Sequence, residues 1–271
     1  MRKSSKPQPV NALIRGLEIL SCFTRPRTEL TVSEIARRVG LSQPTAWRMC
    51  QTLLEQGYLV RSASSKGLRI GAPALSLGYS AIAGLSFAEI ALPYMHEITA
   101  ATSGTTSLNR RHGSDIMSVE RVDGAFVRPN APIGWCVPMV SVASGLAVLA
   151  ALPVDARRAA LDLFEDGDER RARRLQRVDD ALKSYAELGY VRISHSLGVD
   201  YTTIAVPLFE DNSEPADQWA LSCGGIGDRW SDEDVLAAAA ALKRARSLLE
   251  PALLPSLTSK ANLGPDAAGI L

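Results

Sequence analysis

Polar side chains recur within a short segment near the start of the chain: Ser42, Gln43, Thr45, Arg48 and Thr52. Each of them can donate a hydrogen bond, and none is acidic. Serine, threonine, glutamine and arginine are the residue types that reach base edges and phosphate oxygens from a helix lying in the major groove of DNA. The segment therefore predicts a helix that contacts DNA.

Residues 31–58 predict the pair of helices that would position these groups. Thr31 and Glu34 have the T-x-x-E spacing of a capping box, which marks a helix start. Gly40 can adopt the left-handed conformation that ends a helix, and Ser42 is the next expected cap. Apolar residues then recur at i, i+3, i+4 and i+7 in both segments: Val32, Ile35, Ala36 and Val39, followed by Ala46, Met49, Cys50 and Leu53. This is the pattern of a helix-turn-helix.

Two further elements would complete a DNA-binding domain. Residues 11–23 predict a helix that packs across the pair, and residues 59–61 and 68–70 predict a β-hairpin, which after such a helix is a wing. A plain helical hairpin with a solvated face is the alternative, but caps, turn length and charge sign all favour DNA binding. The residues predicted to contact DNA are Thr31, Arg37, Arg38, Ser42, Gln43, Thr45, Arg48, Arg61, Lys66 and Arg69.

The charge distribution agrees with this placement. The 271-residue chain has a net charge of only +1. Residues 1–72 contain twelve Lys and Arg but four Asp and Glu, a net +8, so the remainder carries −7. A basic first quarter on an acidic body predicts that the polyanion-binding surface lies in that quarter.

The other reactive residues form no catalytic or metal-binding pattern. The four cysteines, at positions 22, 50, 136 and 223, include no C-x-x-C pair, so we expect buried free thiols in a reducing cytoplasm. His96, His112 and His195 are scattered, and the sequence has no G-x-S-x-G, H-E-x-x-H or glycine-rich phosphate motif. We expect no enzymatic activity, no metal and no cofactor. We also see no signal peptide and no apolar stretch long enough to span a membrane, and therefore expect a cytoplasmic protein.

The remainder predicts a second domain of mixed α+β class, because its helices group together instead of alternating with strands. The mixed charge run at 165–177 is expected to be a loop or a solvated face. Expected helices cover 73–83, 87–102, 142–152, 155–164, 178–188 and 231–249. Expected strands cover 105–108, 116–121, 126–128, 135–139, 190–193, 203–209 and 219–223.

Several short motifs keep a fixed order along both parts of the chain. They are LTVSEIARRVGL at 30–41, T-A-x-R at 45–48, QTL at 51–53, GYL at 57–59, VERV at 119–122, VPM at 137–139, S-G-x-A-x-L-A at 144–150, GY at 189–190 and IAVPL at 204–208. In this order and spacing they resemble the IclR family of bacterial transcriptional regulators.

The resemblance implies a fold and a set of partners. The fold would be a winged helix-turn-helix domain at 10–72, a linker helix at 73–85, a GAF-like α/β effector-binding domain at 86–252 and a flexible tail at 253–271. Family members are usually dimers or tetramers that bind palindromic operators and respond to small organic acids. The implied partners are therefore double-stranded operator DNA, a small organic-acid effector, further copies of the chain and, for an activator, RNA polymerase.

The resemblance also implies a set of effector-binding residues, at the positions of this chain that match the pocket positions of the family. They are Val137, Ala143, Ser144, Ser196, Asp200, Ser222 and Gly224. Backbone N–H groups around Ala143 would open a helix, and a helix N-terminus is a good carboxylate site. The sequence departs from the family pattern at three places: Ser196 replaces a usual acidic residue, Asp200 a glycine and Val140 a histidine. These positions lie near the implied pocket, so the identity of the ligand does not carry over.

The sequence-based hypothesis is a ligand-responsive transcription factor. Gln43, Thr45 and Arg48 would contact bases or phosphates, and the hairpin would hold the flank of the site. The ligand would act through different affinities for two placements of the DNA-binding heads. The alternative is an architectural DNA-binding protein whose second domain serves only oligomerisation or contact with another protein, but about 190 residues with their own core are more than such a role requires.

Overall fold

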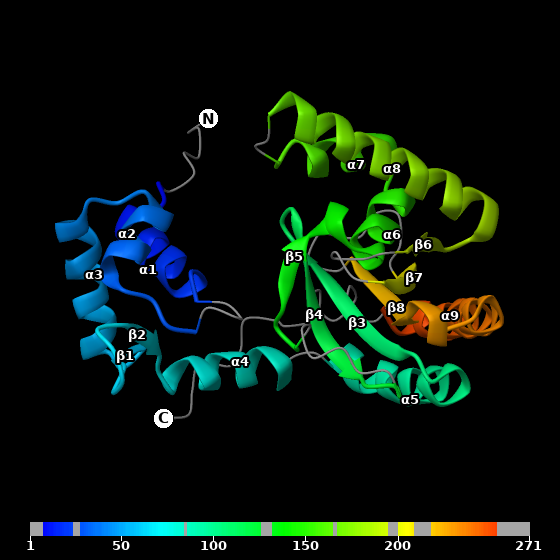
Figure 1. Ribbon diagram of the computed structural model, residues 1–271, viewed down its shortest axis with the longest axis horizontal. Helices are drawn as coiled ribbons and strands as arrows, with labels where there is room; N and C mark the ends of the chain where they lie inside the picture. Colours follow the sequence, from blue (N-terminus) through cyan, green and yellow to red (C-terminus); the bar gives the residue numbers. More distant parts are fainter. Residues whose placement is uncertain are drawn as a thin grey trace, which may run out of the picture. The chain divides into compact units, whose positions relative to one another are not determined.

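The computed structural model describes residues 8–23, 28–83, 86–125, 132–164, 167–194, 200–208 and 218–253 (Figure 1). The chain divides into two compact units, residues 1–84 and residues 85–271.

Unit 1 is a three-helix bundle with a two-stranded hairpin and a further helix. Its elements are α1 (Asn11–Ser21), α2 (Val32–Val39), α3 (Gln43–Glu55), β1 (Leu59–Arg61), β2 (Leu68–Ile70) and α4 (Pro73–Ala83). The strands β1 and β2 pair antiparallel, and an isolated bridge joins Leu30 to Leu68, which ties the hairpin to the entry of α2. The described part of this unit thus has the order of a winged helix-turn-helix.

The predicted caps and apolar faces account for this bundle. Thr31 and Glu34 form a complete capping box at the start of α2. Gly40 ends α2 with φ 67°, and its lack of a side chain makes this left-handed conformation inexpensive. One buried cluster joins α1, α2, α3 and the hairpin through Ile19, Leu30, Ile35, Cys50, Leu59 and Leu68.

In the part of unit 2 that the structure describes, six strands form one antiparallel sheet. Its strands are β3 (Thr105–His112), β4 (Asp115–Val122), β5 (Cys136–Pro138), β6 (Val191–Ile193), β7 (Tyr201–Leu208) and β8 (Trp219–Ile226). Their order across the sheet is β5-β4-β3-β8-β7-β6. Its helices are α5 (Ser86–Thr102), α6 (Ala143–Ala151), α7 (Val154–Leu161), α8 (Asp168–Leu188) and α9 (Asp232–Leu253), with short 3-10 turns at Met139–Ser141 and Gly227–Arg229.

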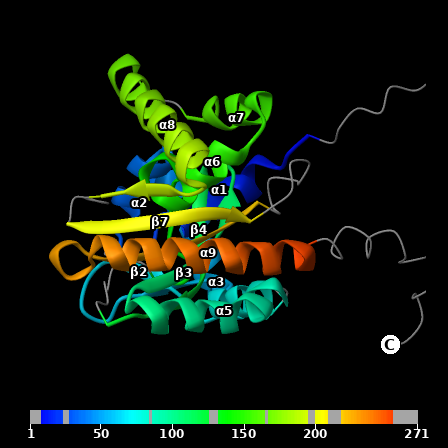
Figure 2. The same cartoon turned by 90° about the vertical axis from the view of Figure 1, so that its right-hand side faces the viewer.

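Helices cover both faces of this sheet. The helices α5 and α9 lie side by side on one face, and α6 lies on the other with α8 packed upon it (Figure 2). Along β8, Trp219, Leu221 and Cys223 join the core under α5 and α9, whereas Ala220 joins the core under α6. This period-two alternation divides the sheet residues between two cores. Ser222 and Gly224 therefore belong to the α6 face.

The structure differs from the sequence-based expectation mainly at α8. We expected a helix only from residue 178, but α8 begins at Asp168. From Asp168 onwards the charged run is helical, and its polar side chains are exposed apart from the buried Arg174. Ser42 occupies the N-cap position of α3 but makes no side-chain capping bond. The strand expected at 126–128 lies outside the described residues. The α+β class and the helix-turn-helix are confirmed.

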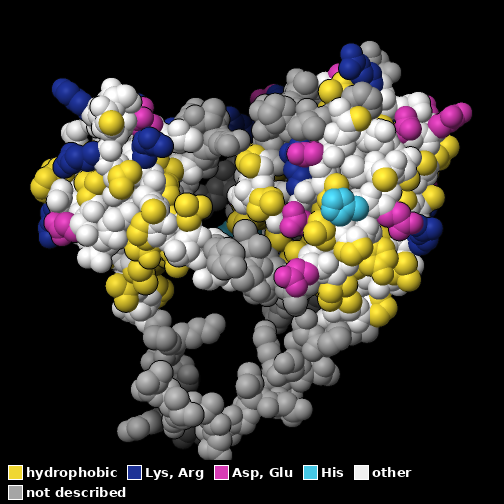
Figure 3. Space-filling model, turned by 90° about the horizontal axis from the view of Figure 1, so that it is seen from below, with side chains coloured by type: hydrophobic (Ala, Val, Ile, Leu, Met, Phe, Trp, Pro, Cys, Tyr) yellow, Lys and Arg dark blue, Asp and Glu magenta, His cyan; other side chains and the backbone are white. Residues whose placement is uncertain are grey.

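The two units differ in their surface charge. On the face seen in Figure 3, Lys and Arg side chains are conspicuous on unit 1, and Asp and Glu side chains predominate on unit 2. Hydrophobic side chains appear on both units in this view. Val10, which precedes α1, and Leu13 and Leu17 on α1 are exposed. Within the described residues, no helix is both long enough and apolar enough to cross a membrane.

Candidate functional site

The helix α3 presents a polar, exposed face. Gln43, Thr45 and Arg48 are all exposed, while Ala46 and Cys50 point into the core. The Gln43 side-chain amide donates to Ser33 Oγ at 2.6 Å and so ties the start of α3 to the first turn of α2. Arg48 forms neither a hydrogen bond nor an ion pair through its side chain with another described residue, and its guanidinium is available to a ligand.

Three further candidate residues, Thr31, Ser42 and Thr45, have side-chain hydrogen bonds within the motif. The Thr31 hydroxyl donates to Glu34 Oε2 at 2.7 Å, and the Thr31 N–H donates to the same oxygen at 2.8 Å. These bonds lower the pKa of Glu34, the backbone bond contributing most. The Ser42 and Thr45 hydroxyls share a hydrogen bond of 2.8 Å. The structure thus assigns Thr31 to the cap of α2, and Ser42 orders the first turn of α3.

The basic candidates are exposed on α2 and on the hairpin. Arg38 donates to the Cys22 carbonyl at 3.2 Å, which fixes it beside the end of α1. The other cations, Arg37, Arg61, Lys66 and Arg69, make no ion pair with any residue that the structure describes. Unneutralised exposed cations around a polar helix are what binding to a phosphate backbone requires.

One residue on this surface escaped the sequence analysis. Trp47 lies on α3 between Ala46 and Arg48, and its side chain is 54% exposed. It is four residues after Gln43 and therefore lies on the same face of the helix. A large exposed aromatic beside Arg48 can pack on sugar or on a thymine methyl group. The signal was an aromatic residue outside the apolar i, i+3, i+4, i+7 series.

Unit 2 contains a cavity of ≈ 100 Å³ between the sheet and the start of α6. Its lining includes a single cationic residue, Arg121, and no Asp or Glu among the described residues. The remaining lining is apolar or uncharged: Thr105, Ser107, Asn109, Ile116, Ser118, Trp135, Val137, Val142, Ala143, Ser144, Tyr201, Thr203, Ser222 and Gly224.

Strand register explains why these residues converge. Thr105, Ser107 and Asn109 alternate along β3 and share one of its faces. Ser107 pairs with Ser222 of β8, and Thr105 pairs with Gly224. Residues directly opposite each other on paired strands point to the same side of the sheet. The sheet therefore directs a row of small polar groups towards α6.

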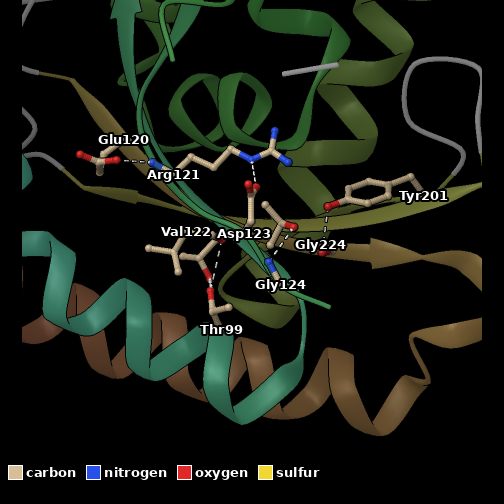
Figure 4. A network of polar contacts seen from close by, with 10 residues as sticks. Thr99, Glu120, Arg121, Val122, Asp123, Gly124, Tyr201 and Gly224 are labelled. Carbon is tan, nitrogen blue, oxygen red and sulfur yellow. Dashed lines mark hydrogen bonds and ion pairs between the residues drawn. The ribbon is translucent and has the colours of Figure 1, made fainter. Parts of the chain in front are cut away.

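A bulge in β4 adds a cation to this row. Leu108 pairs with Glu120, but Asn109 pairs with Ser118, so Val119 is an extra residue. Because of the bulge, the alternation of side chains between the two faces of the sheet shifts by one residue along β4. Ser118 and Arg121, which are three residues apart, therefore both line the cavity. Arg121 is then ion-paired with Asp123, and its backbone N–H donates to Glu120 at 2.8 Å (Figure 4).

The N-terminus of α6 forms another wall. Val142 occupies the N-cap position of α6, but its side chain cannot accept a hydrogen bond. The first backbone N–H groups of α6 therefore have no side-chain capping partner. Gly145 lets this turn pack closely, since a Cβ there would lie 2.2 Å from the Met139 carbonyl oxygen. Tyr201 donates its hydroxyl proton to the Gly224 carbonyl at 2.8 Å (Figure 4). The lining thus combines the first turn of α6 with a tyrosine side chain that is held from β7.

The structure places five of the seven effector-site candidates in this lining: Val137, Ala143, Ser144, Ser222 and Gly224. Asp200 is not among the lining residues and instead lies against Gly227, whose N–H donates to its carbonyl at 3.0 Å. Ser196 lies outside the described residues. The sequence analysis missed Asn109, Ser118 and Arg121, because their convergence depends on register and on the bulge.

The thiols and histidines remain outside both sites. Burial raises the pKa of Cys50 and of Cys136 to about 11, so both thiols are protonated at neutral pH. Cys50 and Cys223 are buried, whereas Cys22 and Cys136 are half-buried. His96 and His112 are exposed on separate elements, and His195 is not described. The part of the chain that the structure describes holds no cluster of metal-ligating side chains.

Comparison with protein families identifies both units. Residues 12–63 match the IclR helix-turn-helix domain, and residues 79–248 match the C-terminal domain of bacterial transcriptional regulators of the IclR type. The chain belongs to the IclR family. This IclR-family protein is therefore a transcriptional regulator with a DNA-binding domain and a C-terminal effector domain, and its relatives are regulators, not enzymes.

Individual relatives agree over most of the chain. The regulator TsaQ1/TsaQ2 of Comamonas testosteroni is 29% identical over 206 residues, covering 73% of this chain and 72% of its own. An IclR-family regulator from Brucella abortus superposes with a TM-score of 0.80 at 28% identity, covering 90% of this chain and 93% of that chain. An IclR homologue from Microbacterium hydrocarbonoxydans, solved with 4-hydroxybenzoate, has a TM-score of 0.66 at 25% identity. The match covers 90% of this chain and 99% of the homologue.

Proposed function

We propose that this IclR-family regulator binds operator DNA through α3 and the hairpin, and that a small organic acid in the cavity of unit 2 controls that binding. On the DNA side, Gln43, Thr45, Trp47 and Arg48 enter the major groove. Arg37, Arg38, Arg61, Lys66 and Arg69 contact phosphates, which fix position without reading sequence. Exposure of these groups supports their assignment.

The cavity lining carries the proposal that the ligand is an acid. The cavity combines Arg121, the uncapped start of α6 and an absence of carboxylates among its described lining residues. A helix N-terminus stabilises an anion, and the lining itself contributes no carboxylate among its described residues. The guanidinium of Arg121 adds positive charge, which it shares with its ion-pair partner Asp123. The apolar part of the lining, including Ile116, Val137 and Val142, then suits the hydrocarbon part of the ligand.

The size of the cavity limits the acid. At ≈ 100 Å³ it is far smaller than the roughly 300–1,000 Å³ of sites for drug-sized ligands. A short aliphatic acid or an acid with one aromatic ring is therefore the expected class. The homologue solved with 4-hydroxybenzoate supports a one-ring acid as one member of this class.

The regulator acts as a homodimer or as a dimer of dimers. The exposed apolar side chains at the start of α1, Val10, Leu13 and Leu17, together with the exposed Leu75 and Leu77 on α4, support self-association. A two-fold symmetric protein matches a palindromic operator, with half-sites about 34 Å or a multiple apart.

A thermal-shift experiment on the full chain tests the acid. Each carboxylate of a panel, such as benzoate or propionate, is compared with its uncharged amide, which has nearly the same shape. A ligand that binds the native state raises its stability in proportion to ln(1 + [L]/Kd). We expect a saturable rise in melting temperature with at least one carboxylate and none with the matching amide. Equal shifts with both, or no shift with any acid, would refute the acid-sensing assignment.

A further inference from the structure

The wall of the cavity formed by β3 and β4 contains a buried hydroxyl without a hydrogen-bond partner in the described part of the chain, Ser118, opposite an amide side chain, Asn109. Ser118 is only 5% exposed and lines the cavity. Its hydroxyl has no hydrogen-bond partner among the described residues. A buried hydroxyl without a partner costs free energy, and native structures rarely keep one without a reason.

Asn109 lies directly opposite Ser118 in the register of β3 and β4. Its amide nitrogen donates to the Ser107 carbonyl and to Ser222 Oγ, both at 3.1 Å. A backbone carbonyl can only accept, so these bonds fix the amide nitrogen on that side. The amide oxygen Oδ1 consequently faces away from Ser107 and forms no hydrogen bond with any described residue.

Ser222 does not compete for these groups. Its hydroxyl accepts from Asn109 and donates to the Ser107 carbonyl at 3.3 Å, which uses its single proton. The wall thus offers one acceptor, Asn109 Oδ1, and one hydroxyl, Ser118, at positions whose Cβ atoms are about 5 Å apart. Asn109, Ser107 and Ser222 hold each other in place before any ligand arrives.

We propose that Ser118 and Asn109 recognise a hydroxyl group of the effector, so that the ligand is a small hydroxy acid. This proposal rests on the acid-sensing function above. A ligand hydroxyl can donate to Asn109 Oδ1 and accept from Ser118 at the same time, whereas a carbonyl oxygen satisfies Ser118 only. An unsubstituted ligand covers both groups and leaves them desolvated without partners, which lowers its affinity.

Matched pairs of acids test the proposal with the full-length protein. The probes are benzoate with its three monohydroxy derivatives, and propionate with 3-hydroxypropionate, measured by isothermal titration calorimetry. We expect at least one hydroxy acid to bind tenfold or more tightly than its parent acid, because sites built around a hydroxyl discriminate strongly against analogues that lack it.

Two variants connect this preference to the residue. Ser118→Ala is expected to reduce the preference to less than threefold, because the hydroxy acid loses a hydrogen-bond partner and the parent acid no longer covers an unpaired hydroxyl. Its melting temperature without ligand should not fall, because the hydroxyl has no protein partner to lose. Ser114→Ala, in the turn of the same hairpin but outside the lining, is the control and should keep the full preference.

The outcomes separate the two proposals. If a parent acid and its hydroxy derivatives bind equally well, or if Ser118→Ala keeps the preference, hydroxyl recognition is refuted while the acid sensor stands. If no acid binds the wild-type protein, both proposals fail together. A marked loss of stability in ligand-free Ser118→Ala would show a structural bond for this hydroxyl and would also overturn the inference.

Discussion

At the scale of single residues, function depends on groups that the fold exposes or leaves without partners. Arg48 illustrates the first kind, because it lies on the exposed face of α3 and forms no ion pair with any described residue. Ser118 illustrates the second kind, since its hydroxyl is buried in a cavity wall and unpaired. In both cases the free hydrogen-bonding capacity of the side chain is the observation that points to a ligand.

Arg48 yields a prediction about DNA binding. Arg48→Ala should weaken specific operator binding by about 1–3 kcal/mol, or roughly 5- to 150-fold, if the guanidinium contacts a base. Acid binding should stay unchanged, since the residue lies in the other unit. Arg173→Ala is the matched control, because Arg173 is an exposed arginine on α8 paired with Glu169. Fluorescence anisotropy with a labelled operator measures both, and unchanged affinity in Arg48→Ala would show that another face of α3 reads DNA.

Gly145 yields a prediction about the cavity. A Cβ at this position would lie 2.2 Å from the Met139 carbonyl oxygen, so Gly145→Ala must displace the first turn of α6. We expect a loss of about 1–3 kcal/mol in stability, typical of overpacking, and a loss of acid binding. Gly167→Ala is the control, because its Cβ would meet nothing within 4 Å. Unchanged calorimetric titrations for Gly145→Ala would mean that the acid does not bind at the start of α6.

At the scale of elements, the capping box of α2 should make the stability of the helix-turn-helix depend on pH. The bonds from Thr31 depress the pKa of Glu34 below its ordinary value of 4.5. A carboxylate with a lowered pKa stabilises the fold at pH values above its unfolded pKa and loses this contribution as the pH falls through its folded pKa.

Glu34→Gln tests this contribution, because glutamine keeps a capping side chain but does not titrate in this range. The difference in melting temperature between wild type and Glu34→Gln should be constant above pH 4.5 and should shrink as the pH falls below it. Differential scanning calorimetry of the transition of unit 1 provides the measurement. A difference that stays constant down to pH 2 would exclude a role for the ionised carboxylate.

The elements also show what the sequence could predict. The helices of unit 1 follow from local rules: a capping box at Thr31, a left-handed Gly40 and apolar periodicity. The first turns of α8 were missed because its residues are charged on nearly every side, so no apolar stripe marked them. Five cavity residues were named only because the chain resembles a family.

The remaining cavity residues could not be predicted from the local sequence pattern. Asn109 and Ser118 meet because two strands pair in one particular register, and Arg121 joins them because Val119 bulges out of that register. Register and bulges follow from packing on both faces of a sheet, not from a strand's own sequence. This dependence explains why the polar wall appears only in the structure.

At the scale of the whole molecule, the account requires that two sites in separate units influence each other. Linkage demands that an acid which changes operator affinity by some factor has its own affinity changed by the same factor in the presence of operator. A ligand that binds both operator-competent and operator-incompetent states equally would change nothing, however tightly it bound. The central claim is therefore a coupling between two binding events.

The most direct test measures operator affinity while the acid concentration is varied. An operator selected from random duplex DNA is titrated with full-length protein, with and without a saturating acid identified by thermal shift. The account predicts a change of about 5- to 150-fold in operator Kd, in either direction, corresponding to a coupling of roughly 1–3 kcal/mol. It also predicts that Gly145→Ala abolishes this change. An operator Kd that stays constant while the acid demonstrably binds would contradict the account.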